Sequence, residues 1–267
     1  MGVSDVLLVG TSGFSYKDWV GSFYPEGTAA ADMFGFYQEN FDTVEIDYTY
    51  YSFPSPRTMA SMAARAKDGF LFSVRTHKSI THDRAASTED VRKAASDFRA
   101  ALAPMYDSGK LACVLIQYPW SFRMNPENVD RMLIAAERFG GLKVAVEFRN
   151  DSWANERMMK LLCDNCLALC CVDEPKLPGL FPPLAASTAD FSYFRFHGRN
   201  SRDWWGSKPG SDRYDYEYTE DELDEWVPGI KKVAGEVGDS YIYMNNCHMG
   251  KAARNAKQLR RKLTEDA

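Results

Sequence analysis

The alternation of short β-rich runs with longer helical patterns constrains the fold of this chain more than any other feature of its sequence. Eight runs have the β-branched and aromatic residues, bounded by turn signals, that are typical of strands. They cover residues 6–12, 43–47, 71–77, 111–117, 143–149, 168–174, 191–198 and 240–246. Helical patterns separate most of them, as at 87–102 and 125–139. Eight strand–helix units in 267 residues predict an α/β fold, a single (β/α)8 TIM-like barrel that spans residues 1–267 as one domain.

Local signals refine this prediction. Thr219, with Glu222 three residues later, is a capping-box signature, so a helix is expected to begin after Thr219. Between the sixth and seventh strands, the segment 174–190 contains four prolines, so its helix is predicted to be reduced or absent. A doubly wound open sheet is the alternative fold, although such sheets usually carry fewer strands.

Composition and charge exclude several classes of protein. With 45% hydrophobic and 13% aromatic residues, the chain can bury a large core and is not expected to be disordered. A net charge of −5 weighs against broad, sequence-independent attraction to nucleic acid. The start, MGVSDVLLVG, lacks the basic region of a signal peptide, and no segment approaches the roughly 18 apolar residues that span a membrane. The six cysteines favour a reducing compartment, and we expect a cytoplasmic protein without a membrane partner.

The strand 143–149 carries charged residues where a core strand is normally apolar. Val144, Val146 and Phe148 are predicted to face the helices, which places Glu147 and Arg149 toward the lumen of the barrel. The same alternation turns the inner face polar toward the carboxyl end of most strands, through Glu45, Asp47, Arg75, His77, Gln117, Asp173, Arg195, His197 and Asn245. Active sites of (β/α)8 barrels lie at this end. Polar strand ends can also mark emergence into solvent or structural ion pairs, but the same sidedness on seven strands favours a functional site.

Several longer motifs carry a resemblance to a known family. They are GTSGFSYKDWVGSFYP (10–25), FDTVEIDYTYYSFPSP (41–56), IQYPWSF (116–122), VEFRNDSW (146–153), TADFSYFRFHGRN (188–200), WW (204–205), DRYDYEYTEDEL (212–223), YIYMNN (241–246) and GKAARNA (250–256). With these motifs the chain resembles the DUF72 (YecE-like) proteins along nearly its whole length. The resemblance implies a TIM barrel and brings no established reaction. The chain departs from the usual family pattern with EIDYTYY in place of EINSTFY, with Arg75 in place of lysine, and with Cys247 and His248 in place of an acidic residue before glycine.

The inner residues form a candidate site for an anionic ligand. Arginine forks bind carboxylate or phosphate through two parallel hydrogen bonds, so Arg75, Arg149 and Arg195 indicate a small phosphorylated or carboxylated molecule. Glu45 or Glu147 is the candidate general base, and His197 is the candidate acid or proton shuttle. The candidate substrate-binding residues are Ser12, Tyr16, Trp19, Asp47, Arg75, His77, Gln117, Arg149, Asp173, Arg195, Arg199, Trp204, Asn245 and Asn246.

Other chemistries fit the pattern less well. A retaining glycosidase needs two carboxylates on different strands, but the seventh strand ends in Arg195 and His197 rather than in an acid. The chain has four histidines, two of which are predicted to face inward, and this does not favour a metal cluster. We therefore predict no metal ligand, and no cofactor is required by the sequence, although a divalent metal is a disfavoured alternative.

Two short motifs have both a structural and a functional interpretation. The cluster CDNCLALCC (163–171) contains a C-x-x-C spacing. Its first two cysteines are predicted to close a helix, and Cys170 and Cys171 to point to opposite faces of a strand, with Cys171 inward, so packing is the favoured role. The turn GTSG (10–13) could cradle a phosphate on its backbone N–H groups, although glycine-rich turns after a strand are common.

Three functions remain open from the sequence. The first is an enzyme of the hydrolase, lyase or isomerase type that acts on an anionic small molecule by acid–base chemistry. The second is nucleic-acid binding or processing, because the loop 198–218 combines Arg199, Trp204, Trp205, Arg213 and Tyr214, which can stack bases and bind phosphates or form a lid. The third is a non-catalytic scaffold. No feature of the sequence specifies an oligomeric state.

Overall fold

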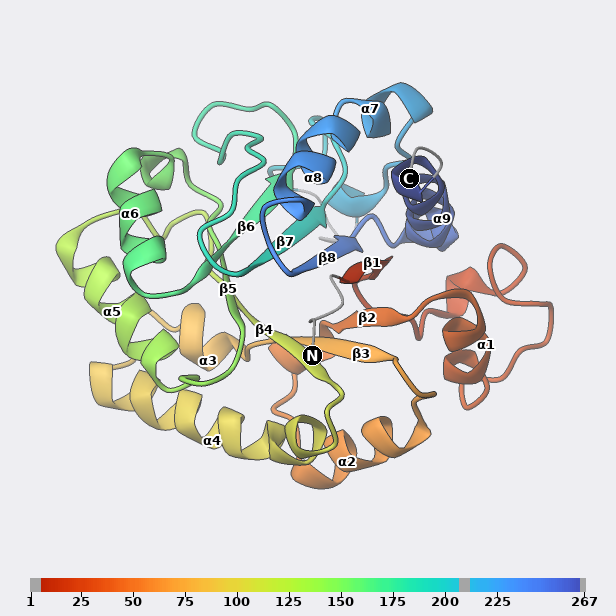
Figure 1. Ribbon diagram of the computed structural model, residues 1–267, viewed down its shortest axis with the longest axis horizontal. Coiled ribbons are helices and arrows are strands. Elements are labelled where there is room, and N and C mark those ends of the chain that lie inside the picture. Colours follow the sequence, from red (N-terminus) through yellow and green to blue (C-terminus); the bar gives the residue numbers. More distant parts are fainter. Residues whose placement is uncertain (1–5, 207–211, 265–267) are drawn as a thin grey trace.

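The computed structural model describes residues 6–206 and 212–264, so the first five residues and residues 207–211 of the long loop lie outside the described part. Within it, eight strands form one sheet in the order β1-β8-β7-β6-β5-β4-β3-β2, and every neighbouring pair is parallel (Figure 1). The strands are β1 (Val6–Thr11), β2 (Thr43–Ile46), β3 (Leu71–Arg75), β4 (Leu111–Gln117), β5 (Val144–Glu147), β6 (Ala168–Asp173), β7 (Phe191–Phe196) and β8 (Asp239–Met244).

The sheet closes into a barrel where β1 meets β2. Ser12 and Glu45 form an isolated parallel bridge, and the backbone N–H of Gly13 donates to the carbonyl oxygen of Glu45 at 2.7 Å. Gly10 permits this close approach, because a Cβ atom there would lie 2.4 Å from the carbonyl oxygen of Thr43. The result is a nearly closed α/β barrel, and it confirms the predicted fold class.

Helices surround the barrel on its outer side (Figure 1). In the described residues these are α1 (Met33–Asn40), α2 (Pro56–Arg65), α3 (Lys78–Thr81), α4 (Thr88–Asp107), α5 (Pro126–Glu137), α6 (Glu156–Asp164), α7 (Glu220–Asp224), α8 (Val227–Ala234) and α9 (Lys251–Thr264). The predicted capping box is confirmed, because the Thr219 hydroxyl accepts from the backbone N–H of Glu222 while the Glu222 carboxylate accepts from that of Thr219.

The connection between β6 and β7 has no helix, as its prolines predicted. Instead it runs back beside the end of β5, where Leu180 forms an antiparallel bridge with Asn150 and the N–H of Phe181 donates to the carbonyl oxygen of Arg149. The indole N–H of Trp120 donates to the carbonyl oxygen of Gly179 at 2.8 Å. The segment thereby becomes part of the barrel mouth.

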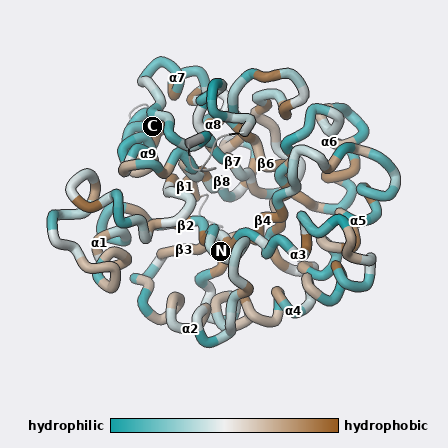
Figure 2. The backbone as a smooth tube through the Cα atoms, turned by 180° about the vertical axis from the view of Figure 1, so that it is seen from behind, coloured by the Kyte–Doolittle hydropathy of each residue, from teal (hydrophilic) through white to brown (hydrophobic). Residues whose placement is uncertain are grey.

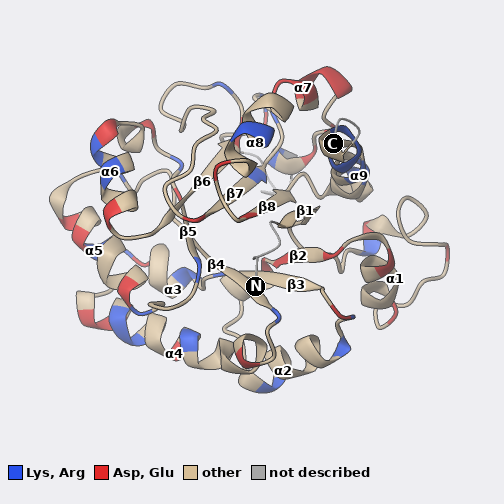
Figure 3. Ribbon diagram, viewed as in Figure 1, with Lys and Arg blue, Asp and Glu red and all other residues tan. Residues whose placement is uncertain are grey.

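The main core lies between the strands and the helices. Helix α4 shows the pattern, because it buries Val91, Ala95, Phe98, Leu102 and Met105 at helical spacing and alternates hydrophilic with hydrophobic stretches (Figure 2). Charged residues gather on the outer helices, with acidic residues on α7 and basic residues on α9 (Figure 3). The apolar outer face of the strands packs on these helices, and their inner face lies toward the lumen.

No helix among the described residues has the length and apolar character needed to cross a membrane.

Candidate functional site

A fully buried arginine joins two strands across the lumen. Arg195, on β7, donates from Nη1 to Glu147 Oε2 and from Nη2 to Glu45 Oε1, each at 2.7 Å. The hydroxyl of Tyr193 donates to the other oxygen of Glu45 at 2.6 Å. All these side chains are fully buried, and Asp47 Oδ1 lies 3.5 Å from Arg195 Nη2. The predicted convergence of charged residues in the lumen is therefore confirmed for β2, β5 and β7.

Arg149 has a similar setting at the end of β5. Its Nε donates to Glu147 Oε1, its Nη1 donates to Glu174 Oε2 at 2.9 Å, and its Nη2 lies 3.3 Å from His197 Nδ1. The guanidinium also lies over the ring of Trp204, 5.8 Å from the ring centroid. The carboxylate and the guanidinium at the end of this strand are thus partners, and they link β5 to β6 and β7.

Arg75 is held in the same way at the end of β3. Its Nη1 donates to Asp47 Oδ1 at 2.8 Å, its Nη2 donates to Gln117 Oε1, and its guanidinium lies 4.0 Å from the centroid of the Tyr50 ring. Each arginine of the lumen therefore has a carboxylate behind it that fixes its position.

Burial and the arginines divide the acids into two groups. Burial alone would raise the pKa of Glu147, but Arg149, Arg195 and His197 hold it well below its usual value. Burial raises the pKa of Glu45, although Arg195 opposes it. Burial also raises the pKa of Glu174 to about 8 against the effect of Arg149. Glu147 is therefore the permanent counter-ion of the cluster, whereas Glu174 is protonated near neutral pH.

His197 is a neutral imidazole in this cluster. Burial, and next Arg149, lower its pKa to about 3. Its Nδ1 lies 3.3 Å from an arginine nitrogen, which can only donate, and 2.9 Å from Asn245 Nδ2. Nδ1 is therefore the acceptor, and the proton is on Nε2, which lies 3.2 Å from Glu147 Oε1.

The prediction for the sixth strand is wrong, because its residues face the opposite way. Cys170 points into the lumen, with its Sγ 3.7 Å from Glu147 Oε2, whereas Cys171 Sγ lies 3.3 Å from the carbonyl oxygen of Ala186 outside the barrel. Every residue of β6 is buried, and its residues before Asp173 are apolar on both faces, so alternation in the sequence could not show which face is inner. At the end of β6 the acid that reaches the lumen is Glu174, which the sequence interpretation missed.

Asp173 and Arg199 consequently form a structural pair beside the helices. The Asp173 carboxylate accepts from Trp226 Nε1 at 2.5 Å, from the Tyr218 hydroxyl at 2.8 Å and from Arg199 Nη2 at 2.7 Å. Arg199 also donates to Glu225 Oε2 at 2.9 Å. Neither residue reaches the lumenal cluster.

Further predicted residues also lie outside this cluster. His77 caps α3 by accepting from the N–H of Ser79, and its ring packs against Phe53. Asn246 donates to the carbonyl oxygen of Tyr216 and to Asn255 Oδ1. The prediction that these side chains bind ligand together with the lumenal arginines therefore finds no support in their positions.

The polar groups in the turn after β1 are already used in hydrogen bonds within the protein. The hydroxyl of Tyr16 donates to the carbonyl oxygen of Ser12, and Trp19 Nε1 donates to that of Cys247. The backbone N–H groups of residues 11, 12 and 13 donate to the Tyr37 hydroxyl and to the carbonyl oxygens of Met244 and Glu45. Because each N–H already has an acceptor, the GTSG turn does not offer a phosphate cradle.

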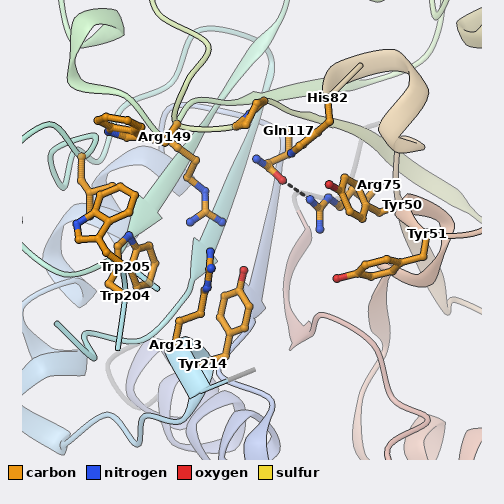
Figure 4. A pocket seen from close by; sticks show the side chains of 13 residues that line it. Tyr50, Tyr51, Arg75, His82, Gln117, Arg149, Trp204, Trp205, Arg213 and Tyr214 are labelled. Atoms are coloured by element: carbon orange, nitrogen blue, oxygen red, sulfur yellow. Dashed lines mark hydrogen bonds between the residues drawn. The ribbon is translucent and has the colours of Figure 1, made fainter. Parts of the chain in front are cut away.

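A pocket of about 500 Å³ opens at the carboxyl ends of the strands, above the lumenal cluster (Figure 4). Figure 4 shows the guanidinium groups of Arg149 and Arg213 directed toward each other, with the Tyr214 hydroxyl beside them. The lining residues are Tyr50, Tyr51, Arg75, His82, Gln117, Pro119, Trp120, Arg149, Leu180, Trp204, Trp205, Arg213 and Tyr214. Three of these described lining residues are arginines and none of them is an acid, so this part of the lining presents positive charge.

The pocket gathers residues that the strand pattern alone did not select. Tyr50, Tyr51, His82 and Trp120 come from loops that follow β2, β3 and β4, outside the alternating strand positions. Their position in the segments that follow strands with polar or charged carboxyl ends was the signal available in the sequence. Conversely, Glu45, Glu147 and His197 lie beneath the arginine pocket and do not line it.

The described residues contain no group of three or more His, Cys, Asp or Glu side chains arranged to hold a metal ion. Cys163 and Cys166 are exposed at the end of α6, and Cys170 and Cys171 point to opposite faces of β6. These four thiols do not converge on one point.

Comparison with known proteins agrees with this architecture. A family model described as "Protein of unknown function DUF72" matches residues 8–267. UPF0759 protein YunF of Bacillus subtilis (strain 168) is 29% identical to this chain over an aligned length of 267 residues. The match covers 95% of this chain and 93% of that protein. 

Solved structures give the same result. A DUF72 family protein from Thermotoga maritima MSB8 has a TM-score of 0.89 and 36% identity, with 97% of this chain and 99% of that chain covered. A DUF72 family protein from Enterococcus faecalis V583 has a TM-score of 0.84 and 26% identity, with 97% and 95% covered. This chain therefore belongs to the DUF72 family, as its motifs indicated.

Proposed function

We propose that this protein is an enzyme that binds a phosphorylated or carboxylated small molecule in the arginine pocket at the mouth of the barrel. The observation that carries the proposal is the convergence of Arg75, Arg149 and Arg213 on one pocket, with no carboxylate among the described residues that line it. Like charges repel, so an anion bound between the three guanidinium groups would offset the repulsion that remains between them.

The arginines are prepared for this role before a ligand arrives. Asp47 holds Arg75, and Glu147 with Glu174 holds Arg149. Among the described side chains Arg213 has no carboxylate partner, and its buried Nε has no hydrogen-bond acceptor. The first two arginines are thus fixed in place, and the third has donors left for a ligand.

The pocket also contains groups suited to proton transfer. Burial, together with Arg75 and Arg149, lowers the pKa of His82 to about 4, which leaves its imidazole free of a second proton at neutral pH. Partial burial raises the pKa of Tyr50, so its hydroxyl remains a protonated donor. We propose His82 as the proton acceptor, while Glu45, Glu147 and His197 position the arginines from below.

Binding of a simple anion tests the first part of the proposal. Inorganic phosphate or sulfate at 100 times its dissociation constant should stabilise the protein by about 2.7 kcal/mol, which raises the unfolding midpoint by roughly 5 °C for a chain of this size. Arg213→Met should lose this stabilisation and keep the midpoint of the free protein, because no described carboxylate depends on Arg213. Arg254→Met, which removes an exposed arginine paired with Glu217, is the control and should retain the full shift. The proposal fails if neither anion stabilises the wild-type protein.

Turnover tests the enzymatic part. A panel of phosphate monoesters and phosphorylated or carboxylated metabolites should contain a compound that the wild-type protein converts. His82→Asn should abolish this conversion and still bind sulfate, because the imidazole is placed as a proton acceptor and the arginines as binding groups. Loss of sulfate binding in His82→Asn would contradict this division of roles.

Nucleic-acid binding is the second candidate function, and one observation favours it. Trp120 and Trp205 are 37% and 51% exposed, and their ring centroids lie 5.2 Å apart at the rim of the arginine pocket. Exposed aromatic rings beside arginines can stack unpaired bases. Single-stranded oligonucleotides should then bind with an affinity that falls steeply with salt and with Trp205→Ala. Equal affinity for an oligonucleotide and for free phosphate would exclude this function.

A further inference from the structure

A second cavity, of about 410 Å³, lies beside the arginine pocket above the ends of β1 and β2. Its lining includes Phe14, Ile46, Tyr48, Tyr51 and Met62 together with the acidic residues Glu45 and Asp47, and the surface of the lining is mostly carbon. We call this space the apolar cavity. It contains no arginine or lysine among its lining residues, so its chemistry differs from that of the arginine pocket.

The two spaces adjoin one another at Tyr51. This residue lines both the arginine pocket and the apolar cavity. It also lines a third cavity of about 500 Å³, which shares Tyr214 with the arginine pocket and Tyr16 and Asp47 with the apolar cavity. Figure 4 shows the ring of Tyr51 on the side of the pocket opposite Arg149. The arginine pocket and the apolar cavity therefore meet at Tyr51.

Exposed aromatic residues gather at the same place. Tyr51 is 68% exposed and Tyr48 is 42% exposed, although both rings could be buried at lower free energy. Isolated exposed rings are ordinary on protein surfaces, but a group of them around one opening indicates a binding site. Tyr51, Trp120 and Trp205 line the arginine pocket, and Tyr48 and Tyr51 line the apolar cavity.

We propose that the ligand of this site is amphiphilic, with an anionic head bound by Arg75, Arg149 and Arg213 and an alkyl or aryl arm that lies over Tyr51 in the apolar cavity. This inference rests on the proposed function and narrows the substrate class. It disfavours small, wholly polar anions such as sugar phosphates, because these would leave the apolar cavity empty. Burial of the arm in a carbon-lined space supplies affinity that the arginines alone cannot supply.

A series of n-alkyl phosphates from methyl to octyl tests the inference by calorimetry, with inorganic phosphate as the reference. One fully buried methylene contributes about a fourfold gain in affinity. If half of that gain is realised in this open cavity, hexyl phosphate should bind roughly thirtyfold more tightly than methyl phosphate. The heat capacity change of binding should become more negative with chain length, because apolar surface is removed from water.

The Thr58→Trp variant tests whether the alkyl arm of the ligand lies in the apolar cavity. Thr58 is an exposed residue of α2 that lines the apolar cavity, so an indole there should fill the cavity and remove the dependence on chain length. Ala60→Trp, at an exposed position of the same helix that does not line the cavity, is the matched control and should keep the dependence. Methyl phosphate should bind equally to both variants.

The outcomes separate this inference from the proposed function. If inorganic phosphate and all alkyl phosphates bind with the same affinity, the arm is refuted and the anion site stands. If no phosphate binds, both are refuted. If chain length raises the affinity equally in Thr58→Trp and Ala60→Trp, the arm lies elsewhere and the assignment to the apolar cavity is wrong.

Discussion

Replacement of Arg195 by methionine tests the buried charge cluster most directly. Methionine is nearly as long as arginine and fills much of its space, so the main change is loss of the charge that Glu45 and Glu147 share. Glu147 keeps Arg149, whereas Glu45 loses its arginine partner and keeps the hydrogen bond from the neutral hydroxyl of Tyr193 at 2.6 Å. Removing one partner of a buried ion pair costs about 3–5 kcal/mol, because the other charge is left without compensation. For a chain of this length that is a fall of roughly 6–10 °C in the unfolding midpoint.

The loss should depend on pH, and its sign follows from the two carboxylates. Burial already raises the pKa of Glu45, and without Arg195 it rises further. A carboxylate whose folded pKa lies above its unfolded value, about 4.3, destabilises the fold increasingly as pH rises from that value to the folded one. Arg149 and Arg195 lower the pKa of Glu147, which stabilises the fold above the unfolded value, and part of that stabilisation is lost with Arg195. The Glu45 effect makes the deficit of Arg195→Met grow as pH rises above about 4.3. The loss at Glu147 is already nearly complete at pH 5 and adds about the same amount at both pH values.

Urea unfolding at pH 5 and pH 8, followed by tryptophan fluorescence, measures this deficit. Arg254→Met is the control, since it removes an arginine from an exposed pair and should have almost no effect at either pH. A deficit that is the same at both pH values would refute the argument for Glu45, because the loss at that carboxylate grows with pH. A deficit of Arg195→Met at pH 8 that is no larger than that of Arg254→Met would also contradict it.

Three further predictions concern the barrel and its pocket. Gly10→Ala should destabilise the fold by about 1–3 kcal/mol, because its Cβ atom clashes where β1 meets β2. Gly35→Ala, in open space on α1, should stabilise the fold by about 0.5–1 kcal/mol. Equal unfolding midpoints of the two variants would contradict this. The ring resonances of His197 should not shift between pH 5 and pH 8 in NMR spectra, because burial lowers its pKa to about 3; a midpoint inside that range would show that the imidazole is not buried as described. Sulfate affinity should fall as pH rises through about 8, where Glu174 ionises beside Arg149, and this fall should be absent in Glu174→Gln; the same pH profile in both proteins would exclude Glu174 as its cause.

The orientation of β5 could be predicted because its two faces differ in the sequence. Val144, Val146 and Phe148 alternate with Glu147 and Arg149, so only one phase allows the apolar set to pack on helices. The same contrast predicted the inward positions of Glu45 and Arg195. Where one face of a strand is clearly polar, the hydrophobic effect determines which face packs on the helices, and neighbouring residues are enough to predict it.

The sixth strand shows where this reasoning ends. Cys170, Cys171 and Val172 give no contrast between faces, because both sides of the strand are buried. Packing decided that Glu174, not Asp173, reaches the lumen, where it contacts Arg149, while Asp173 accepts from Trp226 outside the barrel. No local property of the segment distinguishes the two acids.

The sequence by itself determined the number of strand–helix units, the missing helix before β7, the family, and the presence of charged residues at the strand ends. These features follow from local periodicity, proline content and motifs, which are properties of neighbouring residues. Only the tertiary structure decided which acid pairs with which arginine. It also decided that Arg75, Arg149 and Arg213 share one pocket whose described lining residues include no carboxylate. These arginines lie far apart along the chain, so closure of the barrel is what brings them together and gives the site its charge.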